Sequence, residues 1–397
     1  MKTNKTILLL SIFFICLSKI NAGNLRISIL TCGQGPDLYS TFGHSAVRVI
    51  DSAAHQDIVY NYGTFEFTDD IWFYVKFTRG KLKYMLDASS FEDFMYGYVA
   101  EGRSVEEQEI NLSQEDLQKI KLYLENNLKP ENKYYKYDFY YDNCSTRIRD
   151  IFDKTLSNKL HWNATSDDGS TMRQNLNPYI KEMPWVKWGF YLTLGSVTDV
   201  KATYRTKMFL PFELEKSLSK ATLISPDGTV SPLIKSNLII LEAAKPVLND
   251  SLIDPVYFTL IIVLLIGCYV SHMQFYRDIY WKWYDLFVFG TTGLLGLLIV
   301  FLWFFTDHQT THWNFNLLWA LPTHLLYLSI MLNYRRFYAY TIASGVLLAI
   351  ALLLSIIFQP FHLATYIVIF ILIMRLYVNY RYAKHFNVRR LAFSKIF

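Results

Sequence analysis

Residues 140–152, YYDNCSTRIRDIF, contain a cysteine whose position is suited to covalent chemistry. Cys144 follows Asp142 and Asn143, which are typical helix caps, and the apolar residues after it recur at helical spacing. A thiol at a helix N-terminus has a stabilised thiolate, because the unpaired N–H groups and the helix dipole favour negative charge there. Such a thiolate can attack a carbonyl carbon, and the same N–H groups can hold the resulting oxyanion.

A cysteine nucleophile needs a base, which is usually a histidine. His44 follows Gly43 in TFGHSAVRV at the start of a predicted strand, whereas His55 and His161 lie in a polar turn and a polar loop. A cysteine at a helix start and a histidine at a strand start are the parts of a papain-like dyad, which is defined by geometry and not by chain order. Here the histidine precedes the cysteine, the order of a circularly permuted NlpC/P60-type domain.

The imidazole of His44 also needs a polar partner that fixes its orientation. Asn61, in VYNYG on the next predicted strand, is the favoured candidate. Asp57, Tyr60 and Tyr62 remain alternatives, because the sequence does not determine the register between neighbouring strands.

The elements that must position these residues form an α+β domain. Alternating apolar residues predict strands in NLRISILTC, FGHSAVRVID and DIVYNYGTFEF. A helix is expected from Ser113 to just before Pro130, and a second helix starts near Cys144. The second helix has an apolar stripe made of Ile148, Ile151, Phe152 and Leu156.

Apolar segments at both ends of the 397-residue chain indicate a membrane protein with an outer domain. Residues 1–22 are typical of a signal peptide, with two lysines before an apolar core. Residues 23–254 are then the periplasmic catalytic domain, and residues 255–397 the transmembrane domain. Five apolar stretches predict five transmembrane helices at roughly 256–272, 284–305, 315–332, 337–358 and 364–380.

The charges between these stretches predict the orientation in the membrane. Lysines and arginines follow the first, third and fifth stretches, whereas the loops after the second and fourth contain none. Positive loops lie on the cytoplasmic side. The C-terminus is therefore expected in the cytoplasm and residues 23–254 in the periplasm. The net charge of +5 follows from this topology and does not indicate a nucleic-acid partner.

Two structural interpretations of Cys144 remain open. Cys32 and Cys144 are the only cysteines in residues 23–254, and an oxidising compartment permits a disulfide between them. Cys144 can also be a buried core cysteine. The disulfide would favour a non-enzymatic envelope factor. A free thiol favours an enzyme, for instance an envelope cysteine hydrolase such as a peptidoglycan peptidase or amidase.

Several motifs around these residues resemble one known family. They are LTCGQGPDLYSTFGHSAVRV, VYNYGTFEF, KFTRGKLKYML, EGRSVEEQEINLS and YKYDFYYDNCSTRIRDIF, and further on PWVKWGFYLTLGSVTD and MFLPFELE. In this order they resemble the N-terminal periplasmic domain of the Bacteroidota lipoprotein N-acyltransferase family (Lnb). The C-terminal apolar stretches are similar to the transmembrane domain of that family.

The resemblance implies transfer of a fatty acyl chain from a membrane phospholipid to a diacylated lipoprotein in the bacterial inner membrane. The acceptor is the α-amine of the lipoprotein's N-terminal diacylglyceryl-cysteine. The family's cysteine and histidine correspond to Cys144 and His44, and the chemistry implies a thioester acyl-enzyme. We expect contacts to substrate from Asn143, Arg147, Tyr39 and Tyr62, and no cofactor or metal.

Overall fold

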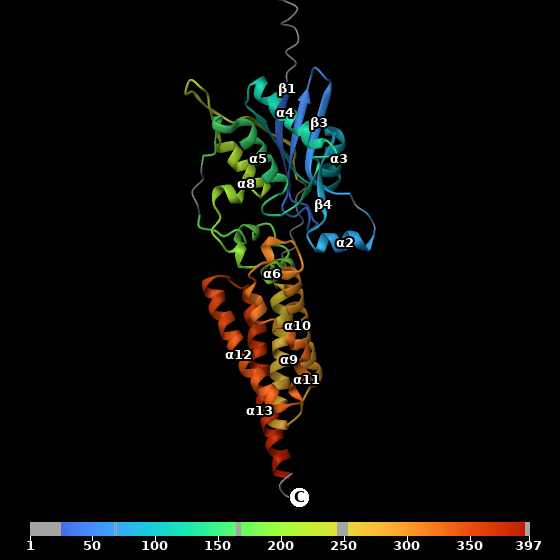
Figure 1. Cartoon of the computed structure of the whole chain (residues 1–397), viewed down its shortest axis with the longest axis vertical. Coiled ribbons are helices and arrows are strands. Elements are labelled where there is room, and N and C mark those ends of the chain that lie inside the picture. The colour runs from blue at the N-terminus through green and yellow to red at the C-terminus, as the bar shows by residue number, and fades with distance from the viewer. Residues whose placement is uncertain (1–24, 67, 69, 164–167, 244–252, 394–397) are drawn as a thin grey trace, which may run out of the picture. The chain divides into compact units, whose positions relative to one another are not determined.

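The computed structural model describes residues 25–66, 68, 70–163, 168–243 and 253–393 (Figure 1). The predicted signal peptide, residues 1–22, lies outside this part of the chain. The chain forms two compact units that are interleaved along the sequence. The sheet unit comprises residues 1–73, 82–168 and 203–246, and the helical unit comprises residues 74–81, 169–202 and 247–397.

A seven-stranded sheet organises the sheet unit, with strand order β10-β5-β1-β2-β3-β4-β6 and antiparallel pairing between all neighbours. The three predicted strands are confirmed as its centre. The strands of this sheet are β1 (Leu25–Cys32), β2 (His44–Asp51), β3 (Gln56–Thr64), β4 (Lys83–Ser90), β5 (Val105–Ile110), β6 (Tyr134–Lys136) and β10 (Ile234–Leu241). A second sheet pairs β7 (Leu160–His161), β8 (Thr222–Ile224) and β9 (Val230–Pro232).

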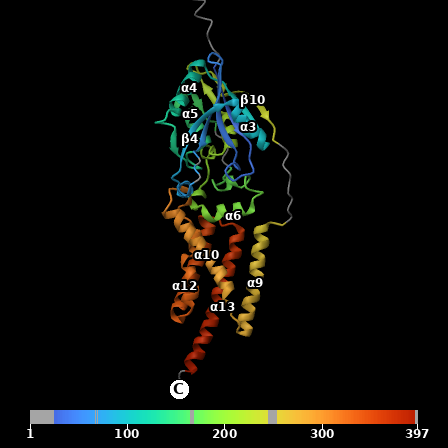
Figure 2. The ribbon, with the colours of Figure 1, turned by 90° about the vertical axis from the view of Figure 1, so that its right-hand side faces the viewer.

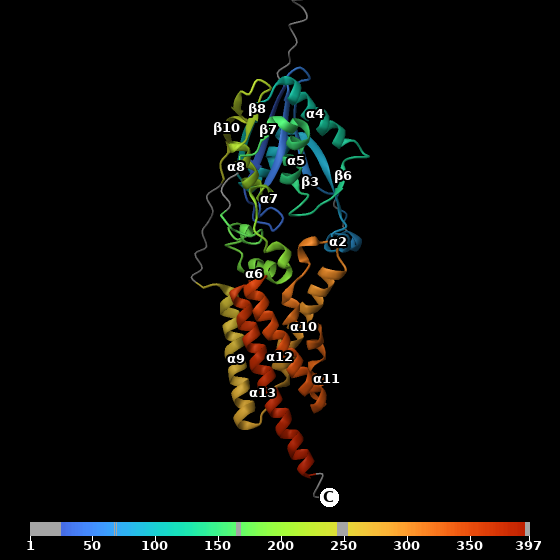
Figure 3. The same ribbon diagram turned by 60° about the vertical axis from the view of Figure 1, so that its left-hand side comes forward.

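Helices cover the seven-stranded sheet on both faces. Figure 3 shows α4 and α5 beside the strands, and the core joins Ile29 of β1 to Ile120 of α4 and Ile148 of α5. On the opposite face, Leu30 of β1 packs with Phe94 of α3. The helices that begin in this unit are α2 (Ile71–Thr78), α3 (Phe91–Glu101), α4 (Gln114–Leu128), α5 (Cys144–Leu156), 3-10 helix η1 (Ser157–Lys159), α7 (Tyr204–Lys207) and α8 (Pro211–Lys220).

The helical unit contains four helices that are long and apolar enough to cross a membrane, within the described residues (Figure 2). They are α9 (Pro255–Arg277), α10 (Lys282–Phe304), α12 (Tyr334–Ile357) and α13 (Leu363–Phe393). Residues 169–202, which precede the predicted boundary at residue 255, also belong to this unit and include α6 (Pro184–Thr193), η2 (Gln174–Leu176) and η3 (Ser196–Thr198).

The expected transmembrane helix at 315–332 differs from the prediction, because this stretch is not one continuous helix. It consists of short pieces that follow η4 (Gln309–Thr311), namely η5 (Phe315–Leu318), η6 (Pro322–Leu326) and α11 (Tyr327–Met331). Pro322 contributes to the break, since proline lacks the N–H that a helix interior requires. The prediction of five transmembrane helices is therefore not confirmed, and four helices meet the length of a span.

The broken stretch nevertheless runs antiparallel to α10. A Cβ at Gly296 would lie 2.1 Å from the carbonyl oxygen of Ala320, and a Cβ at Gly293 would lie 2.8 Å from Leu325. One to two turns earlier in α10, the ring of Phe289 stacks on Tyr327 at 3.6 Å between centroids. Glycines on α10 thus let an irregular backbone approach closely, which a prediction from hydropathy alone does not detect.

Candidate active site

The structure brings together three of the predicted residues at one end of the central strands. Cys144 is the first residue of α5, His44 is the first residue of β2, and Asn61 lies in β3. The β2–β3 ladder pairs Val47 with Tyr60, so that Asn61 lies toward the His44 end of β2. The register that the sequence left open therefore favours Asn61 over its alternatives.

A hydrogen bond orients the imidazole of His44. Its Nε2 lies 2.5 Å from Oδ1 of Asn61. Because a carboxamide oxygen only accepts, Nε2 carries the proton and donates. The other ring nitrogen is then left for the hydrogen bond between His44 and Cys144. The alternative partners of His44 are engaged elsewhere: Asp57 pairs with Arg48 and Tyr62 is buried in the core.

The N-terminus of α5 holds Cys144 in a fixed position. Asn143 caps the helix, since its side-chain oxygen accepts from the N–H of Thr146 at 2.9 Å while the Thr146 hydroxyl accepts from the Asn143 N–H at 2.8 Å. The Asn143 amide also donates to the carbonyls of Phe139 and Phe209 at 2.8 and 2.7 Å. Asn143 is therefore fully engaged in positioning the nucleophile's helix.

The surroundings of Cys144 favour the thiolate. Burial alone would raise the pKa of the thiol, but the charge and hydrogen bond of His44, the N–H of Ser45 and the Ser145 hydroxyl together lower it below its usual value. Burial acts to lower the pKa of His44, yet the neighbouring thiolate and the hydrogen bonds to Cys144 and Asn61 raise it. Both shifts favour a thiolate–imidazolium pair, which is the reactive form of a cysteine nucleophile.

Cys32 lies close to the same histidine but has the opposite character. It is paired with His44 across the β1–β2 ladder and is fully buried. Burial raises its thiol pKa to about 12, despite a hydrogen bond to Tyr98 and the nearby charge of Arg103. Cys32 and Cys144 are both free thiols, so the disulfide that the sequence permitted is absent from this structure.

The predicted substrate contacts other than Asn143 have different environments. Arg147 is bound to Asp142, with Nε 2.7 Å from the carboxylate, and its guanidinium lies 3.5 Å above the ring of Tyr135. Tyr62 is 2% exposed and belongs to the core. Tyr39 is 78% exposed, in the loop between β1 and β2. Of these three, Tyr39 is by far the most exposed to solvent.

Several features near the dyad were not foreseen. The Ser45 N–H and the Ser145 hydroxyl stabilise the thiolate, and Ser45 and Ser145 share a hydrogen bond of 3.0 Å. Arg103 is buried, donates to the Gly33 carbonyl at 2.9 Å and adds positive charge near Cys32. The adjacent positions in FGHS and NCS were visible signals for the two serines, whereas Arg103 is separated from both motifs in sequence.

Gly43 has a backbone conformation that allows strand β2 to start at His44. Its φ of +77° lies in the left-handed region, and a Cβ would lie 2.7 Å from the Cys32 carbonyl oxygen. The absence of a side chain at Gly43 thus lets the backbone of β1 approach closely.

A capped helix that begins with a thiol, an oriented histidine and a set of membrane-length helices define a multi-pass membrane protein with a candidate thiol site in an α+β domain. Comparison with family models gives the more specific assignment. Residues 15–178 match the Lnb N-terminal periplasmic domain, and residues 248–386 match the Lnb transmembrane domain. Together these matches cover more than half of the chain, and the protein belongs to the Lnb family.

Membership confirms the resemblance noted in the sequence and places the α+β domain in the periplasm. It supports an acyltransferase function of the lipoprotein N-acyltransferase type in the bacterial envelope. No curated protein and no solved structure matches the chain.

Proposed function

We propose that this protein transfers a fatty acyl chain from a membrane phospholipid to the α-amine of the N-terminal diacylglyceryl-cysteine of a lipoprotein. The observation that carries the proposal is the hydrogen-bonded Cys144–His44 pair, with the pKa of the thiol lowered and that of the imidazole raised. Cys144 is the nucleophile, His44 the acid and base, and Asn61 the residue that orients His44. The lipid bilayer supplies both substrates.

The first half-reaction acylates the enzyme. The Cys144 thiolate attacks the carbonyl carbon of a phospholipid ester, and a tetrahedral oxyanion forms. The C–S bond is retained and the ester C–O bond breaks, while imidazolium His44 donates its proton to the departing lysophospholipid oxygen. We assign the N–H groups at the start of α5 and of Ser45 as donors to the developing charge.

The second half-reaction transfers the acyl group to nitrogen. The lipoprotein amine attacks the thioester carbon, and neutral His44 accepts the proton that the amine loses. The C–N bond forms, the C–S bond breaks and the thiolate is restored. The sum is an ester and an amine converted to an amide and an alcohol, so no cofactor or metal is required.

The other predicted site residues fit supporting roles. Asn143 and Arg147 stabilise α5 and the loop before it, since their polar groups are paired within the domain. Tyr62 supports the core beneath Arg147, whose guanidinium lies 5.6 Å from its ring. Tyr39 is the one we assign to substrate contact, because its side chain is free of the core.

The membrane orientation predicted from the loop charges completes the proposal. We place the protein in the inner membrane with the C-terminus in the cytoplasm, so that the broken stretch at 315–332 crosses the membrane together with the four long helices. A cysteine hydrolase would use the same dyad with water as acceptor, but nothing in its chemistry calls for a transmembrane domain. The non-enzymatic alternative depended on a disulfide that the two free thiols do not form.

A reconstituted transfer assay tests this function. Full-length protein in phospholipid nanodiscs is mixed with a diacylated lipopeptide that has a free N-terminal amine, and the amide product is measured by mass spectrometry. We expect product from the wild type and from Cys268→Ala, which removes an exposed cysteine of α9. Cys144→Ala and His44→Ala should each lose at least about a thousandfold in rate. Free fatty acid without amide product would show a hydrolase instead.

A further inference from the structure

A cavity of about 340 Å³ lies within the helical unit, beside α6. It is formed by α6, α9, α10, α13 and the loop that contains Trp319. The residues that line it are Trp185, Trp188, Thr259, Leu260, Val263, Phe287, Val288, Thr291, Thr292, Leu295, Trp319, Val368 and Ile371. We call it the α6 cavity. Pockets for small ligands measure roughly 300 to 1,000 Å³, so its size suits a small ligand or a chain.

The α6 cavity is lined mainly by apolar side chains. Most of its few polar groups are already bonded within the protein. The Thr291 hydroxyl donates to the Phe287 carbonyl at 2.7 Å, Thr292 donates to Val288 at 2.9 Å, and Trp188 Nε1 donates to the Thr365 hydroxyl at 3.1 Å. A polar ligand would therefore lose most of its hydrogen bonds to water without replacement. The lining of the cavity therefore favours an apolar ligand.

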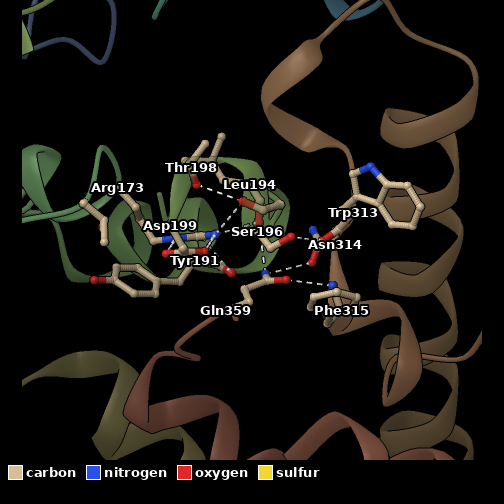
Figure 4. A network of polar contacts seen from close by, with 12 residues as sticks. Arg173, Tyr191, Leu194, Ser196, Thr198, Asp199, Trp313, Asn314, Phe315 and Gln359 are labelled. Carbon is tan, nitrogen blue, oxygen red and sulfur yellow. Dashed lines mark hydrogen bonds and ion pairs between the residues drawn. The ribbon is translucent and has the colours of Figure 1, made fainter. Parts of the chain in front are cut away.

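The α6 wall of the cavity is fixed by a buried polar network (Figure 4). Arg173 forms an ion pair with Asp199 at 2.8 Å, and both side chains are almost fully buried. The Arg173 guanidinium also donates to the carbonyls of Leu194 and Gly195, the two residues that follow α6, at 3.1 and 2.9 Å. The C-terminal end of α6 is thus bound by the Arg173 guanidinium, whose charge is balanced by Asp199.

The same end of α6 is held from the other side by residues of the bundle. Gln359, after α12, donates to the Leu194 carbonyl at 3.2 Å and to Asn314 Oδ1 at 3.1 Å. Asn314 in turn donates to the Leu192 carbonyl at 2.8 Å. These buried bonds fix the C-terminal end of α6, the helix whose Trp185 and Trp188 line the cavity.

The lipid bilayer is the source of the occupant, because the cavity continues the lipid-facing surface. On α9 the lining residue Thr259 is next to Phe258, and on α10 the lining residue Thr291 lies one turn from Leu294. Phe258 and Leu294 are more than half exposed on helices of membrane length. A hydrocarbon chain can therefore enter from the membrane without crossing a polar surface.

A cation on α6 favours a lipid with a phosphate. Lys187 lies between Trp185 and Trp188 in sequence, and no ion pair involves it among the described residues. Tryptophan and lysine side chains together are typical of the level of lipid headgroups. An ammonium group attracts a phosphate, which a diacylglyceryl-cysteine lacks.

We propose that the α6 cavity binds one acyl chain of a membrane phospholipid, whose phosphate lies at the level of α6. The site is separate from the thiol chemistry. It stands whether or not Cys144 forms a thioester, because it rests only on the helical unit.

Photolabelling of the full-length protein tests the proposal. The protein is placed in nanodiscs that contain a phosphatidylethanolamine with a diazirine in one acyl chain, irradiated and digested. Labelling of the lining residues of α9 and α10 is measured relative to α12, which contributes no residue to the cavity. We expect the lining residues to be labelled preferentially in the wild type and equally in Cys144→Ala.

Substitutions that fill the cavity provide the control. Thr291→Trp and Thr259→Trp introduce bulk at two exposed lining positions on different helices, whereas Leu294→Trp adds the same ring outside the cavity. Both filled variants should lose about tenfold in relative labelling, with thermal unfolding unchanged, and Leu294→Trp should keep it. Equal labelling in all variants would overturn the site. Displacement of the probe by free fatty acid as readily as by phospholipid would overturn the assignment to a phospholipid.

Discussion

At the scale of residues, the candidate groups could be chosen from the sequence, whereas their contacts with one another could not. Cys144 and His44 were recognisable from a helix cap and a strand start. Asn61 was the favoured partner in the sequence, but only the β2–β3 register, which depends on a whole ladder of backbone bonds, separates it from its alternatives. The neutral state of Cys32 depends on burial from all sides, which no local pattern contains.

The orientation of His44 gives the first prediction. Asn61→Ala removes the acceptor for Nε2 of His44. The imidazole should then no longer be held in the tautomer and the orientation that direct its other ring nitrogen to Cys144. We expect the rate of acyl transfer to fall by about 10²-fold or more, with little change in thermal unfolding. Asn61→Asp keeps an acceptor and should retain more activity than Asn61→Ala. Equal activity of the wild type and Asn61→Ala would show that another group orients His44.

The pH dependence of Cys144 alkylation gives the second prediction. The pKa of Cys144 is lowered below the usual thiol value of 9.0, mainly through His44 acting against burial. In a Cys268→Ala background, iodoacetamide should therefore react with a midpoint below pH 9. His44→Ala leaves burial as the dominant influence, so the midpoint should move above pH 9. Cys32, with a pKa of about 12, should remain unmodified over this range. An unchanged midpoint in His44→Ala would show that His44 does not lower the pKa of Cys144.

At the scale of elements, local signals were sufficient where capping and periodicity agreed. The helices that begin after Ser113 and Asn143 were predicted from such signals and are confirmed as α4 and α5. The broken conformation of the stretch at 315–332 was not predicted, because hydropathy shows that a segment is apolar but not whether its helix is continuous. That conformation depends on Pro322 and on Gly293 and Gly296 of α10, which let the stretch approach α10 closely.

The cap of α5 gives the third prediction. Asn143→Ala removes the cap of α5 and two further bonds, and should lower the free energy of unfolding by about 1 to 2 kcal/mol. Ser113→Ala is the matched control, because Ser113 caps α4 in the same manner without contacting the dyad. Both variants should lose stability, measured by thermal unfolding, but only Asn143→Ala should also slow Cys144 alkylation. Equal alkylation rates would mean that the cap has no role at the thiol.

At the scale of the whole molecule, the sequence predicted an outer domain followed by membrane helices, and the structure shows units that alternate along the chain. Residues 74–81 and 169–202 fold with the helical unit although they precede the first apolar helix. Long-range contacts such as those of Arg173 and Gln359 determine this division. They join segments distant in sequence, so no window of residues reveals them.

A buried ion pair in the helical unit gives the fourth prediction. Arg375 of α13 and Asp285 of α10 are completely buried, and Arg375 also donates to Ser271 and Gln274 of α9. Asp285→Leu leaves an unpaired buried charge and should destabilise the unit by about 3 to 5 kcal/mol. The double variant Asp285→Leu with Arg375→Met removes both charges and should recover part of this loss. Thermal unfolding in detergent measures both. A double variant no more stable than the single one would contradict the ion-pair account.

The most direct test of the central claim is the intact mass of the full-length protein after incubation with phospholipid alone. The account predicts a fatty-acyl adduct that hydroxylamine removes, present in the wild type and in Cys32→Ser and absent in Cys144→Ala. The adduct should disappear when a diacylated lipopeptide is added. An adduct that persists in Cys144→Ala, or transfer to the lipopeptide by a protein that never becomes acylated, would contradict a thioester at Cys144.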